Sequence, residues 1–540
     1  MESLRVERLD HFGLIASVIK DLRLLERIDA CLVPDDQEEI TPGQAVAGMS
    51  LNGLGFTTRP RSLTPQFFAN PPLDLLFREG VHAEMFNRFK LGRTLDEVYV
   101  YGCDLLLSEL ALAICVQEGI DQRFNHLDTT SFSLSGDYGP ESDAQAIRIT
   151  HGYSQDHRPD LKHAVVALLV SQDGGVPFVS KSWDGNASDT QIFQERAEAL
   201  IATFQRSPRP RYLVADSQLY HEDNAAHLNQ LGFIPRIPHP LKRVAQVVTQ
   251  ALPEDTWQRL DDTMRYHRIA LCHYGRVQRW LVVSSQAALE RAEATVSKAR
   301  QRASEAIEQH LFHLQAQRVA TPEGVQAALA TLAQPWTYHQ VAAYTLSAQK
   351  HSVGNGRPRS TTPIASIDWQ MHAQVTPDHQ KIAYRMQHKA CFVVGTNMAA
   401  SQLSDREVIV AYKGQAQAEG GFRLLKDPLF FVSSLCVKKP CRIQGLLMGM
   451  TCALLVYAVT QRRLRQQLAH QGETVPNQIN QPTARPTWRW VFQLLEGIHR
   501  VRVTVQGKVH DLIEGLNEVQ ITILRLFGEE VCRLYQISSG

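Results

Sequence analysis

The stretch that decides the fold is Phe124 to Leu134, which reads Phe-Asn-His-Leu-Asp-Thr-Thr-Ser-Phe-Ser-Leu. Its alternation of side-chain character is typical of a β-strand, and Asp128 lies inside it. A second aspartate, Asp216, directly follows the apolar run Tyr212-Leu213-Val214-Ala215. Each acid alone is typical of a turn or a helix cap. Burial of a carboxylate on a strand costs free energy unless it is paired or binds a metal, so together the two predict oxygen ligands for a divalent cation.

The pattern around these acids predicts a mixed sheet with helices on its faces. Asp173-Gly174-Gly175 is typical of a hairpin turn, and Ser188 or Asp189 is a suitable helix cap. The predicted strands are 124–134, 146–151, 164–170, 176–183, 211–215 and 234–237, and the predicted helices are 189–205 and 224–231.

The order of elements then changes. A long helix is predicted over 285–318, a Gly/Pro/Arg linker over 354–363 and strands over 364–394. A helix over 406–426 follows and ends before Asp427-Pro428, because a residue before proline disfavours the helical conformation. The stretch 241–400 is therefore predicted to be inserted between the last strand of the sheet and this helix.

The late helix presents chemistry that suits a binding site. Tyr412, Gln415, Glu419 and Lys426 are 3, 4 and 7 residues apart, which places them on one helical face. A carboxylate flanked by a phenol, an amide and an ammonium packs poorly in a core but suits a metal ligand beside groups that hold phosphates; a solvated face is the alternative. Gly420-Gly421 follows, and two interior glycines cost about 2 kcal/mol relative to alanine. We therefore expect another backbone to approach closely there.

Residues 1–120 read as mostly helical. Thr41-Pro42 predicts a helix start, with Gly53 and Gly55 where that helix should end, and another helix is predicted over 105–119. Residues 1–100 hold 11 basic and 15 acidic side chains, so a helical docking module and a DNA-reading helix-turn-helix remain equal alternatives.

Composition sets the class of protein. The chain has 540 residues, 44% of them hydrophobic, and a formal net charge of +1, so the total charge does not indicate a nucleic-acid partner. Nine scattered cysteines without a Cys-x-x-Cys pair indicate a reduced, cytoplasmic protein. The most apolar stretch, 446–459, has 14 residues and is predicted to be a buried helix rather than a membrane span.

Positive charge gathers locally. Residues 438–510 hold 11 Lys or Arg against Glu473 and Glu496, a local excess of 9 that makes the stretch a candidate phosphate-binding surface; solvated helix ends are the alternative. Gly356-Arg357-Pro358-Arg359 is similar to arms that enter the minor groove, although a flexible linker fits equally well. Trp183 and Trp369 are candidate platforms for a flipped base, and buried core is the better interpretation of both.

Asp128, Asp216 and Glu419, on the first strand, the fourth strand and the late helix, resemble the Asp-Asp-Glu (DDE) triad of RNase H-like transposases. The spacing Tyr-x2-Gln-x3-Glu-x6-Lys resembles the Tyr-Arg-Glu-Lys signature of a branch of bacterial insertion-sequence transposases, with Gln415 in the place of arginine. Gln415 loses a charge and a bidentate phosphate contact, which Arg423 on a neighbouring position compensates. The inserted stretch and the motifs 126–131, 152–154, 158–161 and 185–186 also resemble this group, and the likeness covers about 120–460.

This resemblance implies an α/β protein with an RNase H-like mixed sheet, an insertion domain and a helical N-terminal domain. The implied domains are 1–120 helical, 121–240 first part of the RNase H-like core, 241–400 insertion, 401–470 second part of the core and 471–540 C-terminal region. Asp128, Asp216 and Glu419 would hold two Mg²⁺ ions, with Mn²⁺ as a substitute. Tyr412, Gln415, Arg423 and Lys426 would contact DNA.

The implied activity is cleavage at the ends of an insertion sequence and transfer of the freed 3′-hydroxyl into target DNA. The implied partners are double-stranded DNA, as terminal inverted repeats and target, and a second copy of the chain on paired ends; no membrane is implied. The expected location is the bacterial cytoplasm, at the nucleoid when bound to DNA. Two alternatives are a DNA-binding protein on the same fold without catalysis and a metal-dependent nuclease without strand transfer.

Overall fold

The computed structural model describes residues 3–55, 64–138, 145–153, 158–207, 209–251, 253, 256–317, 319–353, 363–427 and 437–538. The chain divides into two compact units, one formed by 1–235 together with 407–540 and the other by 236–406. The segment predicted to be inserted, 241–400, lies within the second unit. The motif Gly356-Arg357-Pro358-Arg359 lies outside the described residues.

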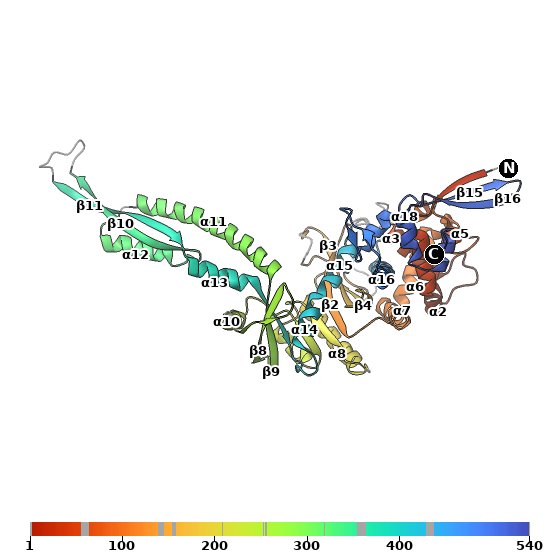
Figure 1. Ribbon diagram of the computed structural model, residues 1–540, viewed down its shortest axis with the longest axis horizontal. Helices are drawn as coiled ribbons and strands as arrows, with labels where there is room; N and C mark the ends of the chain where they lie inside the picture. Colours follow the sequence, from red (N-terminus) through yellow and green to blue (C-terminus); the bar gives the residue numbers. More distant parts are fainter. Residues whose placement is uncertain are drawn as a thin grey trace. The chain divides into compact units, whose positions relative to one another are not determined.

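The first unit contains a five-stranded sheet with the spatial order β4-β3-β2-β5-β6 (Figure 1). Strands β2 (Phe124–Leu134), β3 (Lys162–Ser171) and β4 (Pro177–Asp184) are antiparallel. Strands β5 (Tyr212–Ala215) and β6 (Gly232–Pro235) run parallel to β2. Three antiparallel strands followed by two parallel ones form the RNase H-like mixed sheet that the sequence predicted.

Helices cover both faces of this sheet. Helix α8 (Asp189–Gln205) begins at Ser188, whose side chain accepts a hydrogen bond from the Gln191 backbone, and Ile192 packs with Val165 and Trp183. On the opposite face, Ser180 of β4 meets Thr451 of α16 (Pro440–Gln471) at 3.4 Å. The short α9 (Ala225–Leu228), preceded by a 3₁₀ turn η3 (Glu222–Asn224), replaces the longer helix predicted over 224–231.

The predicted strand 146–151 was wrong. Within 145–153 only Thr150 forms a bridge, with His163 of β3. The backbone of Arg148 bonds instead to the Asp184 carboxylate and to the Gly185 amide, both at the end of β4. These bonds satisfy the polar groups that strand pairing would otherwise have used, so the segment stays irregular.

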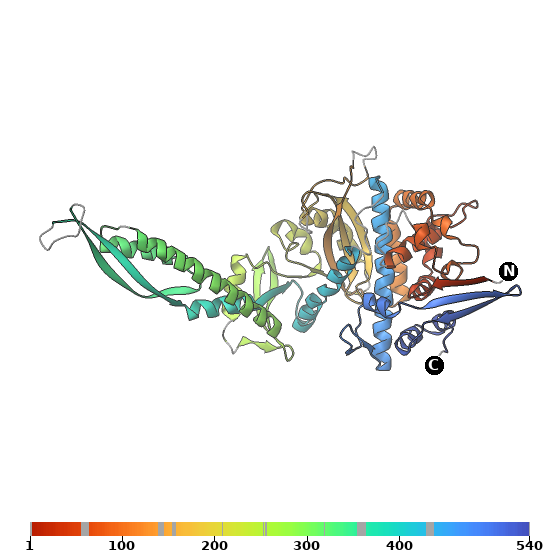
Figure 2. The same ribbon diagram turned by 90° about the horizontal axis from the view of Figure 1, so that it is seen from above.

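Helix α16 is the central helix of the first unit, and Figure 2 shows it between the sheet and the N-terminal helices. Among the described residues it is long and apolar enough to cross a membrane, but 89% of its most apolar window is buried inside the protein. It packs against β4 and four N-terminal helices, so it is the buried core helix that the sequence predicted. A bent pair, α6 (Arg88–Tyr101) with α7 (Cys103–Gln117), meets the same length test only if counted as one span, and its two helices are 86° apart.

The N-terminal region is helical, as predicted. Its helices are α1 (Phe12–Asp21), α2 (Leu24–Cys31), α3 (Pro42–Leu54), α4 (Thr64–Phe67), α5 (Leu73–Leu76), α6 (Arg88–Tyr101) and α7 (Cys103–Gln117), with a 3₁₀ turn η2 (Ala83–Phe86). Thr41 caps α3 through a capping box with Gln44, and Gly55 ends it. Because α3 is buried along its whole length, it is a core helix and not a helix that reads DNA.

The two ends of the chain fold together. Strand β1 (Ser3–Arg8) pairs with β15 (His499–Val505), which pairs with β16 (Lys508–Glu514). Helices α17 (Trp488–Leu494), α18 (Glu518–Arg525) and α19 (Glu529–Leu534) complete this part, and a small pair, β13 (Val475–Pro476) with β14 (Pro482–Thr483), precedes them. The buried Tyr535 donates to the Asp10 carbonyl at 2.6 Å and accepts from the Leu14 amide at 3.1 Å.

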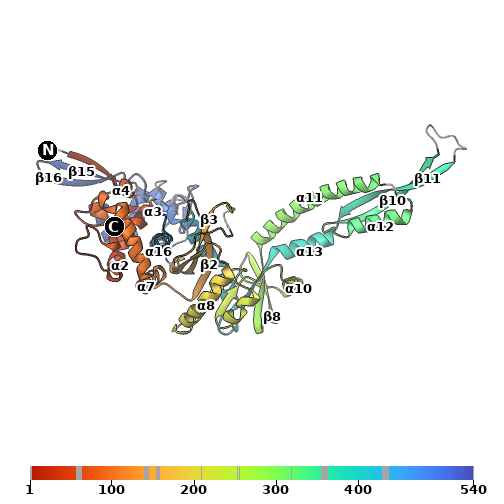
Figure 3. The same cartoon turned by 180° about the vertical axis from the view of Figure 1, so that it is seen from behind.

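The second unit combines a small sheet with a long hairpin. The sheet has the order β12-β9-β8-β7, from Cys391–Thr396, Arg276–Ser285, Met264–His273 and Gln258–Arg259. The hairpin pairs β10 (His339–Ser352) with β11 (Ile364–Pro377), and Figure 3 shows α11 (Gln286–Ala316), α12 (Pro322–Ala333) and α13 (His379–Ala390) beside it. Helix α10 (Lys242–Ala251) precedes the sheet.

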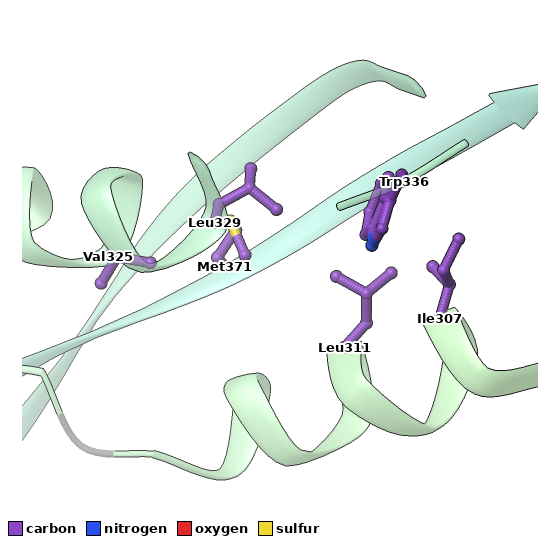
Figure 4. Packing of buried hydrophobic residues seen from close by; sticks show 6 residues of the cluster. All are labelled: Ile307, Leu311, Val325, Leu329, Trp336 and Met371. Atoms are coloured by element: carbon purple, nitrogen blue, oxygen red, sulfur yellow. The ribbon is translucent and has the colours of Figure 1, made fainter. Parts of the chain in front are cut away.

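A separate apolar core holds the hairpin to its helices. Trp336 and Met371 pack between Ile307 and Leu311 of α11 and Leu329 of α12 (Figure 4). Trp369 is partly buried against this cluster. The sequence predicted strands throughout 364–394, which is wrong for 379–390, because the Asp378 side chain caps the Lys381 backbone amide and starts a helix there.

Candidate active site

The register of the sheet places the two aspartates at the same height along their neighbouring strands. Leu127 of β2 pairs in parallel with Ala215 of β5, and Asp128 and Asp216 are the next residues on the two chains. Residues paired across a sheet point to the same face. Asp128 and Asp216 therefore share one face of the sheet, opposite to that of Leu127, and both are half-buried.

The face that carries the aspartates is the one that α16 covers. Asp128 pairs with Leu168 of β3, which pairs with Ser180 of β4, the residue that meets Thr451 of α16. Helix α15 (Gln415–Leu425) packs against both β2 and α16. The helix predicted to supply the third carboxylate therefore lies on the aspartate side of the sheet.

Backbone hydrogen bonds hold the two carboxylates. An oxygen of Asp216 accepts from the amides of Gln218 at 2.9 Å and Leu219 at 3.4 Å, which fixes the turn that ends β5. An oxygen of Asp128 accepts from the Thr129 amide at 2.8 Å. Each carboxylate is thus oriented by its own chain, and each carries a second oxygen, so the donor set suits a shared divalent cation.

His126 lies two residues before Asp128 on the same strand and is fully buried. Burial lowers the pKa of His126 to about 4, and the neighbouring Gln172 side chain opposes this shift only in part. The imidazole is therefore neutral at neutral pH. Both of its ring nitrogens are buried without a hydrogen-bond partner among the described residues.

The predicted helix over 406–426 is two helices, α14 (Asp405–Lys413) and α15, separated by Gly414. Gly414 keeps a helical backbone conformation, and a Cβ there would lie 2.7 Å from the Gln172 side chain. At the start of β2, Arg123 binds Glu407 of α14 at 2.7 Å. Burial lowers the pKa of Arg123, but the Glu407 carboxylate outweighs this and raises it. The ion pair and the glycine together fix the late helices against the sheet.

Glu419 is on α15, but its side chain is exposed. In the part of the chain that the structure describes, no group of three or more His, Cys, Asp or Glu side chains could hold a metal ion. The structure therefore brings Asp128 and Asp216 together and leaves Glu419 outside their group. Like charges repel in the absence of a cation, so a shared ion would be needed to draw a third carboxylate in.

The other residues of the signature lie on the same two helices. Tyr412 of α14 and Gln415 and Lys426 at the two ends of α15 are half-buried, whereas Arg423 is exposed. The close backbone approach predicted at Gly420-Gly421 was wrong. Among the described residues, no heavy atom lies within 4 Å of a Cβ built on Gly420, and a Cβ on Gly421 would meet the Leu454 side chain at 3.4 Å.

Most of the basic stretch 438–510 is neutralised within the protein. Arg442 binds Asp96, Arg462 binds Asp173, Arg463 binds Asp21 and Glu118, and Arg489 binds Asp427. Arg500 is buried between Glu7 and Asp74, and Arg502 binds Asp74 and Asp511. The excess of charge along the sequence is therefore largely structural and does not form a continuous DNA surface.

Sequence reasoning missed a cavity of about 370 Å³ beside α15. Arginines from α15, α16 and α17 line it together with both glycines of the β3–β4 turn. The glycine pairs Gly174-Gly175 and Gly420-Gly421 can be seen in the sequence, but only the fold shows that both pairs line the same cavity. The two tryptophans, in contrast, are core residues, since Trp183 is buried and Trp369 packs in the second core.

The chain matches the family described as "Transposase DDE domain" over residues 127–456, which is more than half of its length. The chain belongs to the DDE transposase family. Residues 4–112 of this transposase also match a domain of unknown function, DUF4277. No curated protein matches it.

Among solved structures, the transposase is similar to the cryo-EM structure of the piggyBac transposase synaptic complex with hairpin DNA. The identity is 7% and the TM-score 0.35, over 92% of this chain and 82% of that one.

Proposed function

We propose that the chain catalyses DNA cleavage at the ends of an insertion sequence and joins those ends to target DNA, with Asp128, Asp216 and Glu419 as the catalytic carboxylates. The observation that carries this proposal is the parallel register of β2 and β5, which sets two aspartates side by side on the face that α15 covers. Membership of the DDE transposase family supports the same reaction class.

Two divalent ions, Mg²⁺ or Mn²⁺, held by the three carboxylates would supply charge neutralisation at the attacking and leaving oxygens. The residues of the chain itself position the DNA. The half-buried Tyr412, Gln415 and Lys426 and the exposed Arg423 lie on the helices that carry Glu419, so they would hold phosphates next to the scissile bond. Gln415 supplies hydrogen bonds there, and Arg423 supplies the charge that Gln415 lacks.

Both steps are displacements at phosphorus, so one site serves both. In the first, water attacks the phosphodiester at the end of the element and a DNA 3′-hydroxyl leaves. In the second, that 3′-hydroxyl attacks a phosphodiester of the target and displaces another 3′-hydroxyl. The partners in this proposal are terminal inverted repeats, target DNA and a second protomer on the paired ends, in the bacterial cytoplasm.

The test is to incubate the full chain and Mg²⁺ with a labelled duplex that carries the repeats flanking its gene. Cleavage followed by joining to a target plasmid supports the proposal. Hydrolysis without joining identifies a nuclease, and binding without cleavage identifies a DNA-binding protein on this fold; either result contradicts strand transfer.

A further inference from the structure

The cavity beside α15 is lined by more positive than negative charge. Arg423 of α15, Arg465 of α16 and Arg489 of α17 line it, against one carboxylate, Asp427. The Asp427 carboxylate pairs with Arg489. Among the described residues, no carboxylate forms an ion pair with Arg423 or Arg465. Within the described residues, the cavity therefore has a net positive lining.

Arg465 is held in place rather than free to turn into solvent. Its Nε donates to the Pro486 carbonyl at 3.1 Å, and its side chain is half-buried. Burial lowers the pKa of Arg465, and the nearby Arg485 lowers it further. A half-buried guanidinium whose close charged neighbour is another arginine gains most from a bound anion.

Glycine forms two walls of the cavity. Gly174 and Gly175 have φ angles of +83° and +67° at the β3–β4 turn, and Arg462 of α16 holds that turn through Asp173 at 2.8 and 2.7 Å. Gly420, the residue after Glu419 inside α15, also lines the cavity. In the described part of the chain, no atom lies within 4 Å of a Cβ built on Gly420, so packing among these residues does not explain this glycine.

A glycine in a helix costs about 1 kcal/mol of stability relative to alanine. Because glycine has no side chain, it lets a ligand approach the helix backbone closely. The polar groups at the rim support the same ligand. The Tyr457 hydroxyl accepts from the Arg489 amide at 3.1 Å, and Gln461 and Thr487 also line the cavity. Fixed arginines, hydroxyl and amide groups, and bare glycine backbone together suit a phosphate group.

We propose that this cavity binds a phosphate of the DNA backbone next to the catalytic helix, with Arg465 and Arg423 as its anchors. The inference rests on the proposed function for the source of the phosphate. DNA is favoured over a free anion because Arg423 is exposed and because Gly420, which lines the cavity, directly follows Glu419, the proposed third catalytic carboxylate.

The experiment measures the affinity of the full chain for a labelled duplex of arbitrary sequence, in Ca²⁺ without Mg²⁺, over a range of salt concentrations. Arg465→Gln is expected to weaken binding and to lower the slope of log affinity against log salt by about 1. Gly420→Leu fills the cavity without removing charge and is expected to weaken binding at every salt concentration. Arg525→Gln, on α18 outside the cavity, is the matched control and should change neither quantity.

Wild-type affinity and slope in both cavity variants, with unchanged thermal unfolding, would overturn the proposal. Chemical modification of arginine by phenylglyoxal distinguishes the ligand. Duplex DNA is expected to protect Arg465, whereas protection by inorganic phosphate at the same phosphate concentration would show a free-anion site and overturn the assignment to DNA. Because the readout is binding without Mg²⁺, loss of cleavage alone would contradict the proposed function and not this cavity.

Discussion

Leu127 of β2 pairs with Ala215 of β5 in parallel register, and each is followed directly by an aspartate. This relationship places Asp128 and Asp216 on one face of the sheet although 88 positions separate them along the chain. Two carboxylates on adjacent strands repel each other, so the arrangement costs free energy unless a cation shares them.

Replacement of either aspartate by asparagine is expected to abolish DNA cleavage while the fold persists. Asp128→Asn and Asp216→Asn keep the side-chain shape and the hydrogen bonds that these residues accept from the backbone, but they remove the charge. Cleavage of the repeat duplex should fall about a thousandfold or more, because charge neutralisation at the reacting phosphate is lost. The free energy of unfolding, measured in denaturant, should stay equal or rise.

Asp223→Asn is the matched control for this pair. Asp223 lies seven residues after Asp216 and pairs with the exposed His221, outside the predicted site. Its cleavage rate should equal that of the wild type. A cleavage rate in Asp128→Asn or Asp216→Asn within a few-fold of the control would show that these carboxylates are not catalytic.

Two glycines of the late helices should respond to substitution with opposite signs. Gly420→Ala should raise the free energy of unfolding by about 1 kcal/mol, because the new methyl group meets no atom within 4 Å and alanine favours a helix. Gly414→Val should lower it by about 1–3 kcal/mol, because a Cβ would lie 2.7 Å from Gln172. Equal effects of the two substitutions in urea unfolding would contradict the packing of α14 and α15.

Arg500 joins the two ends of the chain, and its removal should be costly. It is buried, with hydrogen bonds to Glu7 at 2.6 Å and to Asp74 at 2.8 and 2.6 Å. Arg500→Met should lower the free energy of unfolding by about 3–5 kcal/mol, because it leaves the buried Glu7 carboxylate with the exposed Arg5 as its remaining ion-pair partner among the described residues. Arg502→Gln, at a half-exposed position, should cost roughly 1 kcal/mol or less. Similar costs for the two would exclude a buried ion network.

Because of His126, the free energy of unfolding should decrease as the pH is lowered. Its pKa is about 4 in the folded chain and about 6.5 in the unfolded chain, so below pH 6.5 the unfolded state takes up a proton that the folded state does not. The free energy of unfolding should therefore decrease between pH 6.5 and pH 4, by roughly 3 kcal/mol from this residue, and stay unchanged above pH 6.5.

His126→Gln should flatten this dependence when urea unfolding is repeated across the same pH range. Part of the slope should remain, because burial also lowers the pKa of His11, to about 3. An identical slope in His126→Gln would show that His126 is protonated or solvated in the native state.

The sheet could be predicted from the sequence because its signals are local. The alternation of Phe124 to Leu134 and the turn Asp173-Gly174-Gly175 each depend on neighbouring residues, as does the helix cap at Ser188. The segment 146–151 could not, because its backbone bonds to Asp184 and Gly185, which are remote in sequence. Local alternation in the sequence does not show which groups will form hydrogen bonds with the backbone of a segment.

The role of the charges in the basic stretch 438–510 could not be predicted for the same reason, because their partners are remote in sequence. Arg442 and Arg500 read as DNA-binding residues because their partners, Asp96 and Glu7, are hundreds of residues away. The pairing of β1 with β15 could not be predicted either, since it joins two segments at opposite ends of the sequence. In the site, the strand patterns placed Asp128 within one strand and Asp216 directly after the end of another, but helical spacing did not place Glu419 relative to them.

The central claim is that Asp128, Asp216 and Glu419 share divalent ions, and iron-mediated cleavage of the polypeptide tests it most directly. Fe²⁺ replaces Mg²⁺, and ascorbate with peroxide generates hydroxyl radicals that cut the chain next to the bound ion, with the cuts mapped by mass spectrometry with and without duplex DNA. The account predicts cuts at three places, near residues 128, 216 and 419, which excess Mg²⁺ suppresses. Cuts near 128 and 216 without any near 419, even with DNA bound, would contradict it.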